Sequence, residues 1–143
     1  MLTIKKSLSG KHWKTTGLYF LYKDNNTKNK PLKFKENTLV KGEKLYVVGW
    51  AYQDEEGPQR RYEFEFDKTD DDLHTLIQIK GPKSLAGLSG SPIVDIQNRV
   101  VGLVSTGWQD EESKFTCLQA SKASDVQKFI ENYALIIKND EFL

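Results

Sequence analysis

Strict alternation of aromatic and charged side chains is the pattern that most restricts the fold of this chain. In "RRYEFEFD", residues 60–67, aromatic residues occupy every second position from Tyr62 to Phe66, with charged residues between them. A period of two residues places alternate side chains on opposite faces of a strand. The stretch therefore predicts a half-buried antiparallel strand with the core on one face and water on the other.

Similar short apolar runs recur along the chain, separated by turn-forming residues. Runs rich in β-branched and aromatic residues, bounded by Gly, Pro, Asn or Asp, are typical of strands. Their spacing is typical of a β-barrel or sandwich. Besides residues 60–67, strands are predicted at residues 18–23, 44–51, 73–80, 92–96, 99–105 and 114–120.

The C-terminal end has a helical period instead. Apolar residues recur there at steps of three and four: Val126, Phe129, Ile130, Tyr133 and Ile137. Ser124 and Gln127 have the spacing of a capping box. We expect one amphipathic helix with its apolar stripe on the outside of the β-structure and with three solvent-facing residues, Lys128, Glu131 and Asn132.

Composition and charge limit the partners of this chain. Its 143 residues, 38% of them apolar, are enough for one domain, residues 1–143, with a modest core. The 21 Lys and Arg balance the 20 Asp and Glu, so no long-range field favours nucleic acid or a membrane surface. No apolar run approaches the roughly 20 residues that span a bilayer, and no signal peptide is recognised. If Met1 is the native start we expect a cytoplasmic protein, and the single Cys117 fits a reducing compartment.

No segment predicts a bound metal or cofactor. The acidic run "DKTDDD", residues 67–72, lacks the ligand spacing and central glycine of an EF-hand loop, and we interpret it as a solvated loop. No phosphate-cradling loop is present. Trp13, Trp50 and Trp108 could stack on a ligand, although aromatic residues beside strands usually pack in the core or at its rim.

The stretch whose residues most suggest catalysis is "LAGLSGSPIVDIQNRVVGLVSTG", residues 85–107. A serine nucleophile needs a base to take its proton and donors to hold the oxyanion. Gly87 can adopt a backbone conformation closed to other residues, which would let its N–H and that of Ser89 converge on one point. For "SGSP" alone, however, the usual interpretation is a tight turn between two strands.

The whole stretch resembles the nucleophile region of trypsin-like serine peptidases, in which Gly, any residue, Ser, Gly, a small residue and Pro precede a β-hairpin and a second small-residue segment. "LVKGEKLYVVGW" resembles the strand that opens the family's second barrel, and "ASDVQKFIENY" resembles its closing helix. The resemblance implies a mainly β fold: a trypsin-like antiparallel β-barrel, the second barrel plus a truncated first barrel, with a C-terminal α-helix.

The resemblance also implies roles for particular residues. Ser89 holds the nucleophile position, and the Gly87 and Ser89 amides form the oxyanion hole. Lys83 falls where the family often has the floor of the main specificity pocket and would favour an acidic side chain, the alternative being a solvated loop lysine. The segment whose backbone would pair with an extended substrate comprises Ser105, Thr106 and Gly107.

Two members of the family's catalytic triad have no match in this chain. His12 lacks the small-residue context of the family's base, and His74 comes after the strand that the acid should open. The positions for that acid hold Thr16 and Gly17, and Asp24 is interpreted as a turn residue. Without a base, residual catalysis would come only from binding and the oxyanion hole.

Three functions stay open at this stage. The chain could be the serine-bearing part of an endopeptidase whose histidine comes from missing upstream chain or a second subunit. It could be a pseudoenzyme that holds an extended peptide or protein segment without cleaving it. It could also be an oligomerisation or regulatory unit that acts through exposed sheet edges.

Overall fold

The computed structural model describes residues 32–35, 38–52, 54–55, 60–70, 72–81 and 84–140, with side chains described up to residue 132. These residues form β1 (Lys44–Gly49), β2 (Arg60–Asp70), β3 (Leu73–Lys80), β4 (Pro92–Val94), β5 (Val100–Gln109), β6 (Thr116–Lys122) and α1 (Ala123–Asp140).

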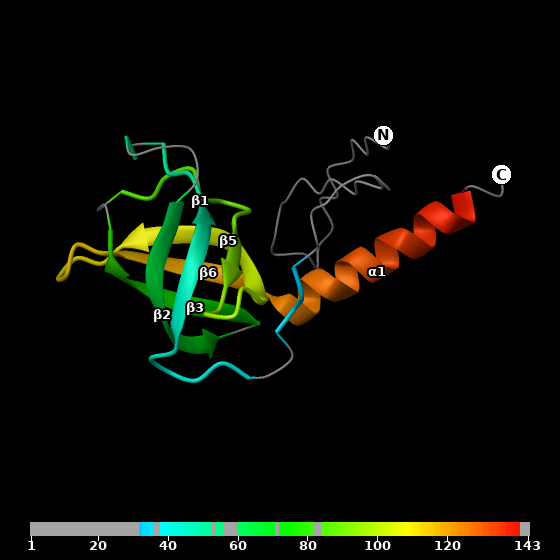
Figure 1. The fold of residues 1–143 in the computed structure, drawn as a ribbon, viewed down its shortest axis with the longest axis horizontal. Helices are drawn as coiled ribbons and strands as arrows, with labels where there is room; N and C mark the ends of the chain where they lie inside the picture. The colour runs from blue at the N-terminus through cyan, green and yellow to red at the C-terminus, as the bar shows by residue number, and fades with distance from the viewer. Residues whose placement is uncertain are drawn as a thin grey trace.

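Antiparallel pairing closes the strands into the barrel that Figure 1 shows. The strand order is β1-β2-β3-β6-β5-β4, and β4 pairs with β1. Tyr46 of β1 pairs with Val94 of β4 at the closing seam. Closure pairs β1 with β4, the two strands that would be the outer strands of an open sheet. The predicted fold class, a mainly β antiparallel barrel with a C-terminal helix, is confirmed.

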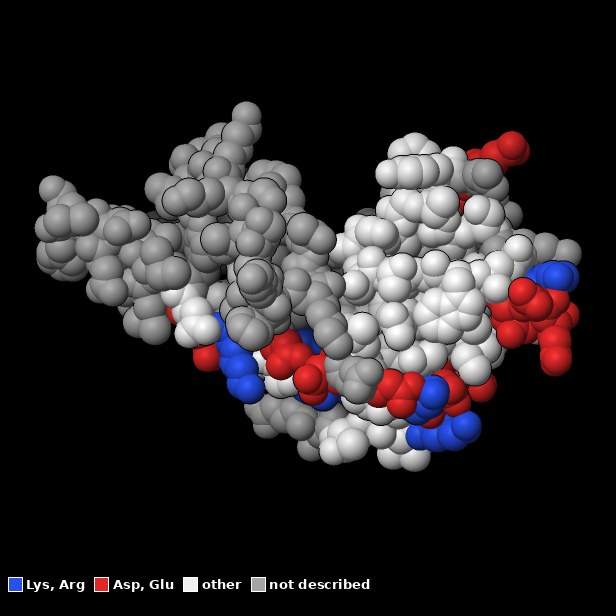
Figure 2. Space-filling model, turned by 180° about the vertical axis from the view of Figure 1, so that it is seen from behind, with Lys and Arg blue, Asp and Glu red and all other residues white. Residues whose placement is uncertain are grey.

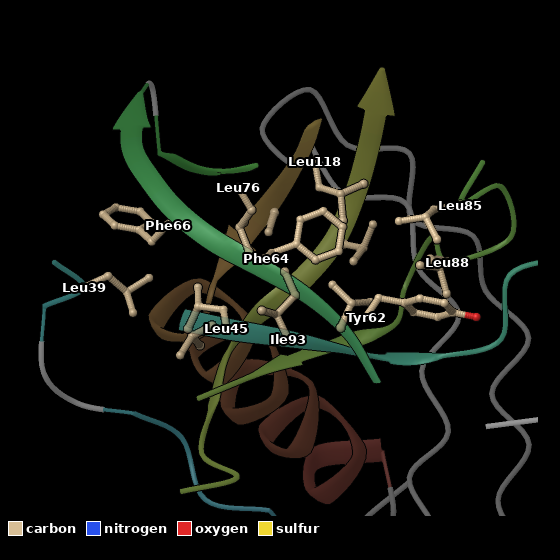
Figure 3. Close-up of a cluster of buried hydrophobic side chains, with 14 of the residues drawn as sticks. Leu39, Leu45, Tyr62, Phe64, Phe66, Leu76, Leu85, Leu88, Ile93 and Leu118 are labelled. Carbon is tan, nitrogen blue, oxygen red and sulfur yellow. The ribbon is translucent and has the colours of Figure 1, made fainter. Parts of the chain in front are cut away.

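The barrel interior is built by the alternation that the sequence predicted. Tyr62, Phe64 and Phe66 of β2 are all buried, whereas Glu63 and Glu65 between them are partly exposed. Figure 3 shows the three aromatic side chains together with leucines from other parts of the barrel. Because one face of β2 is fully removed from water, a shift of one residue in its register would expose this whole set, and the register is well determined.

Most predicted strands lie where they were expected, with shifted ends. The prediction for residues 73–80 coincides with β3, but β5 runs to Gln109 instead of ending at residue 105. β4 ends at Val94 instead of residue 96, because Asp95 begins the turn into β5. The strand predicted at residues 18–23 lies outside the described residues.

The acidic run at residues 67–72 was predicted to be a solvated loop, and this prediction is wrong. β2 continues through it to Asp70, and Asp72, with a φ of 73°, lies in the tight turn into β3. Lysines pair with its carboxylates: Lys41 Nζ is 2.7 Å from Asp67 Oδ1, and Lys122 Nζ is 3.0 Å from Asp72 Oδ1. In the part of the chain that the structure describes, no group of three or more His, Cys, Asp or Glu residues could hold a metal ion.

Helix α1 leaves the end of β6 and projects beyond the barrel (Figure 1). It begins at Ala123, so Ser124 lies inside the first turn and the predicted capping box is wrong. Val126 is buried, and α1 packs against β5 and β6 on the outside of the barrel. The three residues predicted to face solvent are exposed: Lys128, Glu131 and Asn132. Among the described residues, no helix is long and apolar enough to cross a membrane.

Candidate functional site

Ser89 lies at the surface, in the loop that joins β3 to β4. The loop is anchored by two leucines, Leu85 and Leu88, which are buried in the barrel core near Tyr62 (Figure 3). Ser89 and Gly90, by contrast, are exposed and form a turn. The two buried leucines thus anchor the loop to the barrel core, while Ser89 itself is exposed to solvent.

Hydrogen bonds attach this loop to the middle of β5. The Ser91 N–H donates to Leu88 O at 2.9 Å, which closes the turn around Ser89. The Gly90 N–H donates to Val104 O at 2.8 Å, and the Val104 N–H donates to Ser91 O at 3.0 Å. The turn therefore lies directly beside the point at which the predicted substrate segment begins.

The predicted substrate segment, Ser105 to Gly107, is a sheet edge. On one side it belongs to β5 and pairs with β6, with Thr106 opposite Gln119. On the other side β4 pairs with β5 only as far as Leu103. Within the described residues, the edge of β5 from residue 105 to residue 109 has no strand partner, so its outward main-chain groups can pair with another extended chain.

The strands on either side of this edge carry no charged side chain, although the β5–β6 turn at its end holds Asp110, Glu111, Glu112 and Lys114. Residues 84–94, 100–109 and 116–121 contain no Asp, Glu, Lys or Arg. β5 and β6 lie at the back of the barrel in Figure 1, and the view from behind in Figure 2 shows a broad described face without charged side chains. Trp50 and Trp108 are 52% and 45% exposed, so neither is a core residue.

Gly87 has the backbone conformation that the sequence analysis required of it. Its φ is +102°, in the region that residues with a Cβ rarely adopt. Among the described residues, neither the Gly87 N–H nor the Ser89 N–H donates a hydrogen bond to another protein group. Both donors are therefore free to bind a ligand atom.

Tyr52 is a neighbour of this loop that sequence reasoning missed. Its N–H donates to Ala86 O at 2.9 Å. Its ring lies on Gly87 so closely that a Cβ on this glycine would be 2.7 Å from the ring atoms Cδ1 and Cε1. No local signal could have shown this, because Tyr52 directly follows the strand predicted at residues 44–51 and is distant in the sequence from Gly87.

The turn that carries Tyr52 is held by buried polar groups. The Tyr62 hydroxyl donates to Asp54 Oδ2 at 2.7 Å and accepts from the Ala51 N–H at 3.1 Å. The Trp50 indole N–H donates to Asp54 O at 3.0 Å. Burial raises the pKa of Tyr62, and the adjacent Asp54 carboxylate adds to this effect against the opposing Ala51 N–H. The hydroxyl therefore stays protonated and keeps donating to Asp54.

The β4–β5 turn that follows the loop is organised by a buried carboxylate. Asp95 is 1% exposed, and its Oδ1 accepts from the Gln97 and Arg99 N–H groups, each at 2.9 Å. Its Oδ2 accepts from Arg99 Nε at 2.8 Å. Burial acts to raise the pKa of Asp95, but these donors outweigh burial and hold the pKa below its ordinary value. Sequence reasoning missed this role, although Asp95 and Arg99 four residues apart around a turn were a usable signal.

The described residues supply no base for Ser89. His74 lies in β3, where its Nδ1 is 2.9 Å from Thr69 Oγ1 and its ring meets the Phe66 ring edge to face. Within the described ranges, no histidine or carboxylate is hydrogen bonded to Ser89. The other residues weighed from the sequence lie outside the described residues, namely Lys83, His12, Trp13, Thr16, Gly17 and Asp24.

Comparison with known proteins adds a similarity of fold. No protein-family model and no curated protein sequence matches this chain. Among solved structures it is similar to Rv3671c from M. tuberculosis H37Rv, crystallised as a serine-to-alanine mutant in an inactive form, with a TM-score of 0.57 and 16% identity. The match covers 76% of this chain and 55% of that chain, so it spans little more than half of Rv3671c. Rv3671c is a serine protease of the chymotrypsin fold, and the barrel described above has this trypsin-like fold.

Proposed function

We propose that this chain is a trypsin-like domain that binds an extended peptide along β5, beside Ser89, and that it lacks a complete catalytic triad. The observation that carries the proposal is the pair of hydrogen bonds between Val104 and the loop at Gly90 and Ser91. They join the loop to the start of the unpaired edge of β5. A chain that adds to this edge as a further strand would run directly toward Ser89.

The chemistry of the surface indicates the kind of segment that binds. Main-chain hydrogen bonds along a sheet edge give affinity to any extended chain, and side-chain contacts select among them. Residues 100–109 and 116–121 contain no charged residue, so a charged ligand side chain that lies over these strands, short of the β5–β6 turn at residues 110–114, would lose hydration without gaining a partner. We therefore propose a neutral, extended segment as the ligand.

A second candidate function is catalysis completed by another chain. The exposed Ser89 hydroxyl and the two unengaged amides of Gly87 and Ser89 favour it, because they are the groups that an acyl-transfer site needs besides its base. The missing histidine would then come from chain outside the described residues or from a second subunit. Serine without such a base is a weak nucleophile near neutral pH.

Binding is tested with a neutral hexapeptide of alternating valine and threonine, titrated into ¹⁵N-labelled protein. We expect shifts at the amides of residues 105–109, and we expect these shifts to persist in Ser89→Ala. The matched control is the same peptide N-methylated at alternate positions, which keeps its side chains but cannot donate to the β5 edge. Equal binding of the methylated peptide, or shifts confined to other surfaces, would contradict the proposal.

Catalytic completeness is tested with a fluorophosphonate probe and mass spectrometry, with Ser89→Ala as the control. We expect no adduct on the purified chain, because the described residues supply no base for Ser89. A stoichiometric adduct that Ser89→Ala abolishes would show that a base reaches Ser89, and the second candidate function would replace the first.

A further inference from the structure

We propose that Tyr52 is a positioning residue that clamps the peptide unit between Ala86 and Gly87 and so sets the direction of the Gly87 N–H. The effect of Tyr52 on the conformation of Gly87 is inferred from the contacts of Tyr52 alone. Its consequence for ligand binding rests on the proposed function, to which it adds that the Gly87 and Ser89 amides bind a terminal carboxylate or carbonyl oxygen of the peptide that lies along β5.

The main chain of Tyr52 holds one end of that peptide unit. The Tyr52 N–H donates to Ala86 O at 2.9 Å, and no cis peptide bond occurs in the described chain. In a trans peptide the C=O and the N–H are coplanar and point in opposite directions. Holding Ala86 O toward Tyr52 therefore turns the Gly87 N–H away from Tyr52.

The ring of Tyr52 holds the other side of the unit. It lies where a Cβ of Gly87 would be, with ring atoms 2.7 Å from that position. Glycine adopts positive and negative φ with similar ease, so Gly87 has little conformational preference of its own. A ring against its Cα blocks rotation of the peptide unit and favours the observed φ of +102°.

The rest of the molecule supports this clamp from both sides. On the Tyr52 side, the turn is fixed by the buried hydrogen bonds between Tyr62, Asp54 and Ala51. On the loop side, a Cβ on Gly49 would lie 2.5 Å from Ser91 Oγ, so the end of β1 and the loop are already in close contact. Tyr52 is 81% exposed, so burial does not account for the position of its ring.

The clamp is tested first by NMR on wild type, Tyr52→Ala and the conservative variant Tyr52→Phe. Because Tyr52 is exposed, both variants are expected to fold, and urea unfolding checks this. We expect the Gly87 α-proton resonance to carry a ring-current shift that Tyr52→Phe keeps and Tyr52→Ala loses, together with exchange broadening at Gly87 in Tyr52→Ala. Unchanged Gly87 resonances in Tyr52→Ala would overturn the inference whether or not any peptide binds.

The consequence is tested with the neutral hexapeptide in two forms, one ending in a free carboxylate and one in an amide. Wild type and Tyr52→Phe should prefer the carboxylate by about tenfold, the effect of a charge-assisted hydrogen bond, and Tyr52→Ala should lose this preference. A preference that survives in Tyr52→Ala would refute the role of Tyr52 and leave the proposed function intact. Equal affinity of wild type for the two forms would instead refute the anion-binding role of the amides.

Discussion

Gly87 and Gly90 show at the residue scale how two similar glycines differ in their surroundings. Both have a left-handed backbone, with φ of +102° and +82°. A Cβ on Gly87 would meet the Tyr52 ring, whereas a Cβ on Gly90 would have no described atom within 4 Å. The strain of the left-handed backbone is therefore common to both positions, but only Gly87 is also crowded.

Alanine at either glycine should cost about 1–2 kcal/mol of stability, the penalty for a residue with a Cβ in this conformation. Gly87→Ala should in addition displace the Tyr52 ring, which is exposed and can rotate away. Urea unfolding and the aromatic NMR signals of Tyr52 separate the two effects, with Gly90→Ala as the matched control. The interpretation fails if the Tyr52 signals respond equally to both substitutions.

At the scale of the element, the β4–β5 hairpin depends on one buried carboxylate. Asp95→Asn keeps the shape of the side chain but removes the charge that Arg99 faces, with Arg99 Nη2 2.7 Å from Asp95 Oδ2. We expect a loss of about 2–3 kcal/mol in the free energy of unfolding, somewhat below that for a fully buried ion pair because Arg99 is partly exposed. Asp110→Asn, in the exposed β5–β6 turn, is the control and should cost much less. Equal losses would show that the burial of Asp95 is unimportant.

The pH dependence of this contribution follows from the lowered pKa of Asp95. The contribution is fully present above the ordinary value of 3.8 and is lost as the pH falls through the lower pKa of the folded protein. Urea unfolding below pH 3.8 should therefore show a smaller difference between wild type and Asp95→Asn than it does at neutral pH.

At the scale of the whole molecule, charges on β6 and α1 change the pKa of His74 in β3. Burial lowers the pKa of His74 below 6.5, Lys122 of β6 lowers it further, and Asp125 of α1 acts in the opposite direction. As the pH falls, His74 therefore takes up a proton at a higher pH in the unfolded chain than in the folded protein. The contribution of the neutral histidine to the free energy of unfolding is full above pH 6.5 and falls as the pH decreases toward the pKa of the folded protein.

His74→Gln should therefore flatten the decline in stability between about pH 7 and about pH 5, where an ordinary histidine titrates. Urea unfolding midpoints across this range measure the effect. Parallel pH profiles for wild type and His74→Gln would rule out His74 as the group responsible.

The sequence by itself determined the elements and part of the candidate site. Alternation at Tyr62, Phe64 and Phe66 predicted the buried face of β2 because the side-chain period of a strand is local. The glycine pattern around Ser89 predicted a turn in which Gly87 can adopt a left-handed backbone, because a glycine has no Cβ to forbid that conformation. These inferences needed no knowledge of which strands pair.

Only the tertiary structure decided which groups lie against that turn. Tyr52 and Gly87 are far apart in the sequence and meet because β1 and β4 close the barrel. Val104 reaches the Ser89 loop for a related reason, since β5 pairs with β4. Asp54 is one of three consecutive acidic residues after β1, and its bond to Tyr62 exists only once β2 is paired with β1. Such contacts depend on strand order and register, which the alternation of a single strand does not specify.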